Sequence, residues 1–181
     1  DGKFGFKAPN LRRSYQSGKT VASILGESFP NTILLALVSI AFAFVVGVTL
    51  GSLAAIYSDT WLEKAILLLT SFGMSLPSFF AAILIAWFFA FVLADFTGLS
   101  MFGSLYSVDD FGNGEYIDLK NLILPALTLG IRPLSVICEL TKSTMKEVLQ
   151  QDYIRTAKAK GLSKFQIIKN HALRNTLNPV V

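Results

Sequence analysis

The chain of 181 residues carries a formal net charge of +4, from 16 Lys/Arg against 12 Asp/Glu. Charged residues make up 15% and hydrophobic residues 52%, whereas soluble domains carry about 25% charged residues. This deficit indicates that lipid is the solvent, and the single cysteine, Cys138, excludes an internal disulfide and a cysteine-rich metal site.

The first 30 residues are polar and aromatic, and five of them are Lys or Arg. Within this segment, Ile24, Leu25 and Phe29 would share one side of a helix over residues 21–29. That pattern suits a short helix lying at the membrane surface, and a solvated loop with one anchoring turn explains it equally well. We expect residues 1–30 to lie outside the membrane, on its extracytoplasmic side.

Residues 31–57 contain no charged side chain. A helix of this length reaches roughly 40 Å, enough to cross a bilayer core of about 30 Å with some tilt. Small residues recur every fourth position along it: Ser39, Ala43, Gly47, Gly51 and Ala55. Such a ridge lets another helix approach closely, so we predict that Gly47, Gly51 and Ala55 form a helix-packing face. The general Gly/Ala richness of membrane helices is the alternative explanation.

Residues 65–94 form a second uncharged stretch, which Pro77 interrupts. Proline has no N–H, so the carbonyl of Gly73 loses its helical partner. In lipid such a loss is tolerated only where protein or water replaces the bond. A broken helix in a transporter can also mark the solute path. We therefore regard Ser75, Pro77 and Ser78 as candidates for lining a translocation path, with a plain kink as the alternative.

Residues 95–119 are predicted to form a loop outside the membrane, because they contain five acidic residues and no Lys or Arg. The acidic residues lack the order of ligands and glycine that an EF-hand requires. We therefore expect a solvated acidic loop and no metal site. The five residues are Asp95, Asp109, Asp110, Glu115 and Asp118.

Residues 121–144 form the third predicted span, which contains Arg132 and Glu139. These two residues are seven apart, so they lie on similar faces of a helix. Charges at membrane depth are expensive and often functional. They could pair with each other, pair with neighbouring helices, or lie beside water in a cavity. The sequence assigns a role to neither.

Residues 145–178 form a basic segment, predicted to be two short helices joined at Gly161. Glycine suits the left-handed end of the first helix because it has no Cβ. Ser163 can cap the second helix, and Gln166 is spaced to return to the Ser163 amide. Residues 142–174 contain eight Lys/Arg and two acidic residues, which places this segment in the cytoplasm. The five basic residues before residue 31 argue the other way but weigh less, because long segments translocate despite their charge.

A family resemblance rests on the run Asp152-Tyr153-Ile154-Arg155-Thr156-Ala157-Lys158-Ala159-Lys160-Gly161, followed by His171-Ala172-Leu173-Arg174-Asn175 and Pro179. This pattern resembles the cytoplasmic "EAA" loop of ABC importer permeases, especially in the oligopeptide and dipeptide branch. Residues 75–79 and 124–128 extend the resemblance. Arg155 stands where the name of the motif expects Glu, and Asn178 stands where Leu is usual. Glu139 stands where the family usually has Arg, so no role is carried over to it.

The resemblance implies an all-α, multi-pass transmembrane helical bundle in a prokaryotic inner membrane, with the basic segment as a helix-turn-helix coupling loop. It implies an ABC type I importer in which this chain and a second permease form the pathway. Two ATPase subunits would drive it, and an extracytoplasmic solute-binding protein would deliver a dipeptide, an oligopeptide or a related small solute such as a nickel complex. We also expect the chain to be part of a longer permease, with spans before residue 1 and after residue 181.

The resemblance also implies roles for particular residues. The residues that would dock the loop onto the ATPase are Tyr153, Arg155, Thr156, Ala157, Lys158, Lys160, Gly161 and Leu162. On the opposite side of the membrane, Asp109, Asp110 and Glu115 are candidates for contacting the solute-binding protein.

Signatures of bond chemistry are missing from the sequence. It contains no phosphate-binding or dinucleotide-binding glycine motif, and its one histidine, His171, lacks the partners of a zinc motif. No Asp lies in the three spans to complete a Ser-His-Asp site. We expect a transport subunit with no cofactor and no enzymatic activity, whose ATP is hydrolysed on a separate chain.

Other functions remain open from the sequence. The basic segment could bind nucleic acid or anionic lipid, but charge attraction alone would not require the Gly161 turn and the Ser163 cap. Docking to an ATPase is therefore favoured, and no nucleic-acid partner is expected. An ion-coupled secondary transporter and a non-transporting membrane scaffold are the remaining alternatives.

Overall fold

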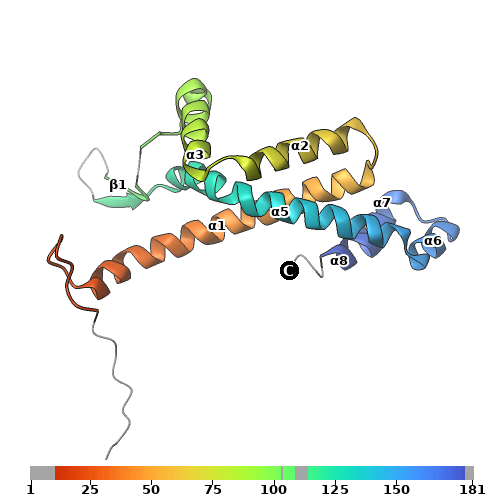
Figure 1. The fold of residues 1–181 in the computed structure, drawn as a ribbon, viewed down its shortest axis with the longest axis horizontal. Helices are drawn as coiled ribbons and strands as arrows, with labels where there is room; N and C mark the ends of the chain where they lie inside the picture. Colours follow the sequence, from red (N-terminus) through yellow and green to blue (C-terminus); the bar gives the residue numbers. More distant parts are fainter. Residues whose placement is uncertain (1–10, 103, 109–113, 178–181) are drawn as a thin grey trace, which may run out of the picture.

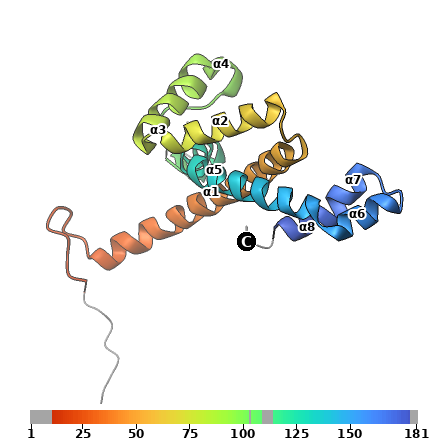
Figure 2. The ribbon, with the colours of Figure 1, turned by 45° about the vertical axis from the view of Figure 1, so that its right-hand side comes forward.

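The computed structural model describes residues 11–102, 104–108 and 114–177 (Figure 1). Its longest helices, α1 (Val21–Ile56) and α5 (Ile123–Gln150), lie side by side. The helices α2 (Trp61–Ser75) and α3 (Ser78–Trp87) also pack on α5, which lies between α1 and α2 when the molecule is turned (Figure 2). In the described part, two helices are long and apolar enough to cross a membrane, and the α2–α3 pair is a third if it is one span. This arrangement confirms the predicted all-α fold.

Helix α1 begins earlier than the predicted span. The side chain of Thr20 caps it by accepting a hydrogen bond from the Ser23 amide at 3.3 Å. Residues 21–29 are therefore the first turns of α1 and not a separate short helix, which corrects that expectation. Pro30 lies inside the helix, where it removes one backbone hydrogen bond and its ring crowds the Gly26 carbonyl.

The contact between α1 and α5 depends on glycine. A Cβ placed on Gly47 would lie 2.9 Å from the carbonyl oxygen of Leu134, and one placed on Gly51 would lie 2.5 Å from the carbonyl oxygen of Cys138. Both distances are too short for real atoms, so only glycine allows the two backbones to approach this closely. All five residues of the small-residue ridge are buried: Ser39, Ala43, Gly47, Gly51 and Ala55.

The second predicted span, residues 65–94, is not one helix. Helices α2 and α3 meet at an angle of 115°, and the backbone of Leu76 and Pro77 between them is extended. Proline disfavours helical geometry at the residue before it and removes one hydrogen bond. The result is a complete break at Pro77, after which α3 turns away from α2 (Figure 1). The π-helical turn η1 (Phe88–Val92) continues α3.

The predicted acidic loop contains structure that the sequence prediction missed. It begins with α4 (Ala94–Thr97) and includes two short antiparallel strands, β1 (Tyr106–Val108) and β2 (Glu115–Ile117), with Tyr106 opposite Ile117. The short 3-10 helix η2 (Leu119–Leu122) then leads into α5.

At the other end of the molecule, α5 continues to Gln150, past the predicted end at residue 144. Gln151 is extended, and α6 (Asp152–Ala159) follows it. The chain then forms α7 (Lys164–Ile167), the π-helical turn η3 (Ile168–Ala172) and α8 (Leu173–Thr176), which together make one helical run. These helices lie at the end of the molecule where α1 ends, and the strands lie at the opposite end (Figure 1).

The glycine contact predicts the effect of one added methyl group. Replacing Gly51 with alanine should destabilise the full-length protein by about 1–3 kcal/mol, because the methyl group overpacks the contact with α5. Gly26→Ala is the matched control, since a Cβ at Gly26 meets nothing within 4 Å. Thermal unfolding in detergent measures both. Equal melting temperatures for the two variants would show that the contact is not tight.

Candidate functional site

The candidate site is the helical hairpin formed by residues 152–176, that is, by α6 and the run α7–η3–α8. Its apolar core is shared with the ends of the long helices, so the hairpin is packed onto them. The buried members are Ala55 of α1, Met145 and Val148 of α5, and Ile154, Ala157, Ile167 and Ala172 of the hairpin itself. The hairpin is therefore in direct contact with the ends of both α1 and α5.

The turn between the two helices of the hairpin has the predicted geometry. Gly161 has a φ of 76°, in the left-handed region. The Gln166 amide donates to Ser163 Oγ at 3.3 Å, and the Ser163 amide donates to Gln166 Oε1 at 3.0 Å, so the predicted capping box is confirmed. The Leu162 amide donates to the Ala157 carbonyl at 3.3 Å and closes the end of α6. The turn is thus fixed by backbone geometry as well as by packing.

Polar contacts add to the packing of the hairpin. Asn175 Nδ2 donates to the Tyr153 hydroxyl at 2.8 Å and joins its two helices. The buried Thr176 hydroxyl lies 3.3 Å from Met145 Sδ of α5. The ammonium of Lys164 lies 5.7 Å from the centre of the Tyr57 ring, just after α1, a distance at which a cation is attracted to an aromatic face.

The predicted docking residues divide into two groups. Ala157 is only 6% exposed and packs inside the hairpin, so its small side chain serves the internal core and is not available on the surface. The others are exposed: Tyr153, Arg155, Thr156, Lys158, Lys160, Gly161 and Leu162. Arg155 lies 3.4 Å from Asp152, an exposed pair of small energetic value.

A hollow of about 340 Å³ lies between the hairpin and the ends of the long helices. Its wall combines five apolar side chains with two lysines. The lining residues are Ile56, Leu149, Lys158, Leu162, Lys164, Ile167 and Ile168. A partner could place an apolar side chain here and a carboxylate beside it.

An ion pair that the sequence did not predict links α2 to α5. Lys142 Nζ lies 2.6 Å from Glu63 Oε1, and the Asp59 amide donates to Glu63 Oε2 at 2.6 Å. The two charged side chains are only 21% and 10% exposed. The one available signal was the position of each charge at the edge of an apolar stretch, which does not identify the partner.

The α2–α3 break holds the predicted path residues and makes a contact with α5. Ser75, Pro77 and Ser78 are all exposed there, and Ser75 Oγ donates only within its own helix. Arg132 Nη2 of α5 donates to the Leu76 carbonyl at 3.3 Å. A guanidinium therefore satisfies a backbone acceptor at the break.

Ser135 Oγ of α5 also donates to the Thr70 carbonyl of α2 at 2.9 Å. Gly73 permits the close approach, because a Cβ there would lie 2.7 Å from Ile131 Cγ2. Arg132 and Glu139 do not pair with each other among the described residues. Helix α2 is thus held to α5 at both of its ends and in its middle.

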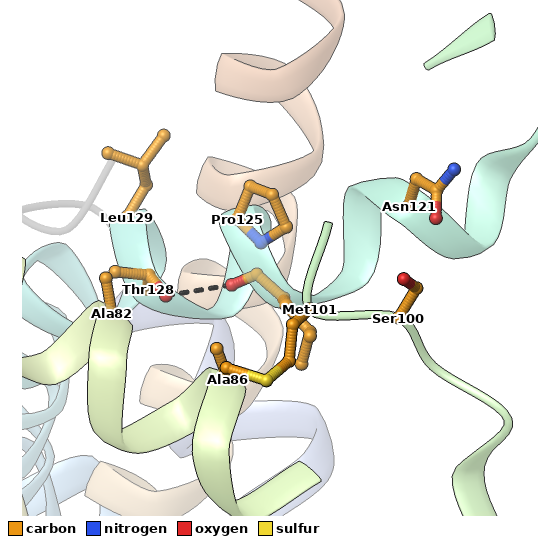
Figure 3. A pocket seen from close by; sticks show the side chains of 9 residues that line it. Ala82, Ala86, Ser100, Met101, Asn121, Pro125, Thr128 and Leu129 are labelled. Atoms are coloured by element: carbon orange, nitrogen blue, oxygen red, sulfur yellow. Dashed lines mark hydrogen bonds between the residues drawn. The ribbon is translucent and has the colours of Figure 1, made fainter. Parts of the chain in front are cut away.

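A pocket of about 340 Å³ lies between α3 and the start of α5, away from the hairpin (Figure 3). Its lining residues are Ala82, Ala86, Ser100, Met101, Asn121, Leu124, Pro125, Thr128 and Leu129. The Thr128 hydroxyl donates to the Leu124 carbonyl at 2.9 Å, the bond dashed in Figure 3. Of the three candidate contacts for a binding protein, Asp109 and Asp110 lie outside the described residues, and Glu115 lies in β2.

The family described as binding-protein-dependent transport system inner membrane component matches residues 47–181. A putative peptide transport system permease protein of Brucella abortus (strain 2308) is 36% identical over 172 residues, which cover 95% of this chain and 52% of that protein.

Two further relatives have similar names. The dipeptide transport system permease protein of Bacillus subtilis (strain 168) is 36% identical over 173 residues, covering 96% of this chain and 50% of the relative. The peptide transport system permease protein of Salmonella typhimurium (strain LT2) is 30% identical over 181 residues, covering 91% and 56%. The chain therefore spans about half the length of the curated relatives it matches.

The hairpin core predicts a difference between two neighbouring alanines. Ala157→Glu should destabilise the hairpin by about 3 kcal/mol, because it buries a charge that has no partner. Ala159→Glu, at an exposed position of the same helix, should leave the hairpin intact. Hydrogen exchange of residues 152–176 in the full-length protein measures both. Equal protection in the two variants would contradict the internal packing of Ala157.

The ion pair between Glu63 and Lys142 predicts non-additive effects. Lys142→Met should lower the melting temperature, because it leaves the Glu63 carboxylate in a confined site without its cation. The double variant Glu63→Leu/Lys142→Met should recover much of the loss, since it removes both charges. A double-mutant cycle of melting temperatures in detergent provides the test, and strictly additive effects would show that the pair is uncoupled.

Proposed function

The chain belongs to the family of binding-protein-dependent transport system inner membrane components, and from this membership we propose that it is part of the permease of an ATP-driven ABC importer. It forms the translocation pathway together with a second, homologous permease chain. The names of the relatives, which are peptide and dipeptide permeases, favour di- and oligopeptides as the solute over a related small solute such as a nickel complex. The protein is a multi-pass component of the inner membrane.

The hairpin of residues 152–176 carries this proposal, as the docking element for an ATPase. Its inner side is fixed to α1 and α5, and its exposed surface presents Arg155, Lys158 and Lys160. Charges of one sign on a rigid element favour a partner with a complementary acidic surface. The adjoining hollow, with Lys158 and Lys164 beside five apolar side chains, gives that partner a place for an apolar anchor.

Hydrolysis of ATP is assigned to two separate ATPase chains, because this sequence has no phosphate-binding motif. The work must then pass through the hairpin into the spans. The hairpin and α1 share the core around Ala55, and α1 is locked to α5 through Gly47 and Gly51. The pair Glu63–Lys142 carries the movement on to α2. Closing of the ATPases would thus rock α1, α2 and α5 as one body between inward- and outward-open states.

Two other regions of the chain have proposed roles. Ser75, Pro77 and Ser78, at the break between α2 and α3, are assigned to the translocation path, because a broken helix exposes backbone groups that a solute can use. The acidic segment with Asp109, Asp110 and Glu115 is assigned to the solute-binding protein. The strands within this segment lie at the end of the molecule opposite to the hairpin (Figure 1), as docking on the far side of the membrane requires.

Reversing charge on the hairpin tests ATPase docking. The variant Lys158→Glu/Lys160→Glu of the full-length permease should lose co-purification of the ATPase and transport, while its membrane insertion remains normal. Both lysines are exposed, so the fold should tolerate the change. Lys120→Glu, in η2 at the opposite end of α5, is the control and should retain the ATPase. Normal co-purification with the double variant would rule out docking through this face.

A further inference from the structure

One face of α5 remains uncovered by α1 and α2 along the whole helix. Its residues follow one another in alternating steps of four and three, which keeps them in one line on a helix. They are Pro125, Leu129, Arg132, Val136, Glu139, Ser143 and Lys146, and every one is exposed. We call this line the open stripe of α5.

A hollow lies at each end of the open stripe. Pro125 and Leu129 line the pocket between α3 and α5 (Figure 3). A second hollow of about 360 Å³ is lined by Leu67 of α2 and by Glu139, Lys142, Ser143 and Lys146 of α5. The α2–α3 break touches the stripe between them, where Arg132 reaches the Leu76 carbonyl. The stripe thus connects hollows near the two ends of a membrane-length helix.

The chemistry of the open stripe does not suit lipid. The exposed face of α1 has the apolar character that suits lipid, with Leu37, Ile40 and Val45 well exposed. The stripe instead places Arg132 and Glu139 within a candidate span, where isolated charges are costly. Glu139 is exposed and makes no ion pair among the described residues. Lys142 and Lys146 line the same hollow, and water or a ligand can reach the carboxylate there.

Arg132 and the backbone near it also remain available. Arg132 donates one hydrogen bond to the Leu76 carbonyl, whereas a guanidinium has five N–H donors. Pro133, within α5, has no N–H to give to the Leu129 carbonyl. The middle of the stripe therefore offers hydrogen-bond donors and an acceptor that apolar chains cannot satisfy.

We propose that the open stripe of α5 is one wall of an aqueous solute path and a binding surface for a short zwitterionic peptide. The peptide carboxylate pairs with the Arg132 guanidinium, and its terminal ammonium pairs with the Glu139 carboxylate. Seven helical residues rise about 10.5 Å, and an extended tripeptide spans about 10 Å, so the two ends match. This inference rests on the proposed function, since it assigns the solute to a peptide permease.

Cysteine labelling tests the path without depending on transport. Val136→Cys and Ser143→Cys place thiols on the stripe, and Val45→Cys places one on the exposed face of α1. Cys138 is fully buried, so it adds little background. In membranes that contain the full-length permease complex, a charged, membrane-impermeant thiol reagent should modify the stripe thiols roughly tenfold faster than Val45→Cys, because only thiolates in water react.

The labelling results separate the alternatives. Slower modification of Val136→Cys when a tripeptide is added supports peptide binding on the stripe. Modification as slow as that of Val45→Cys overturns the proposal, because the stripe is then covered by lipid or by another protein chain. Labelling does not require an ATPase, so it stands even where the ATP-driven import proposed above fails.

Blocked peptides test the charge pairing. Glu139→Gln should weaken binding of a free tripeptide by roughly tenfold, as expected for a lost charge-assisted contact, and should leave the N-acetylated tripeptide unaffected. Glu147→Gln, an exposed position of α5 outside the stripe, is the matched control and should change neither. An equal loss for free and acetylated peptides would overturn the pairing, because Glu139 would then act through the fold alone.

Discussion

The close backbone contact between α1 and α5 is the constraint on which the other features depend. Glycines at positions 47 and 51 let α1 lie against the Leu134 and Cys138 carbonyls of α5, and Gly130 accepts Phe42 in the same way. Two helices joined at this distance have little freedom to slide. The ends of both can therefore share one small apolar core with the hairpin.

Helix α5 has three distinct sides, and each has different surroundings. One side is packed against α1, and a second is held to α2 by the Ser135–Thr70 hydrogen bond and the Glu63–Lys142 pair. The third side carries charge and remains open. Helix α5 is also less uniformly apolar than α1, and the aqueous path proposed above would lower the cost of placing Arg132 and Glu139 within a span.

The sequence predicted those features whose cause is local. The turn at Gly161 and the Ser163 cap depend on residues a few positions apart, and the small-residue ridge follows from the helical period. The break at Pro77 was placed correctly, but its 115° angle depends on the contacts of α3, which a sequence does not show. The three-residue strands are too short to give a periodic signal.

The burial of Ala157 could not be predicted from the sequence, because a small residue in a helix fits a close docking surface and a tight core equally well. The pair Glu63–Lys142 joins residues from different helices, so no spacing rule reveals it. Family membership confirmed the class of protein, but the assignment of individual side chains required the packing.

The π-helical turn η3 has a consequence for the second helix of the hairpin. Ile167 and Ala172 are five positions apart, a separation that would point them about 140° apart on a regular α-helix, yet both are buried in one core. The π-helical turn is wider and holds one additional residue, so the side chains of Ile167 and Ala172 both face the same core. Loss of one residue within Ile168–Ala172 would therefore convert the turn to ordinary α-helix with the core face preserved, whereas the same loss elsewhere in the run would rotate everything after it out of register.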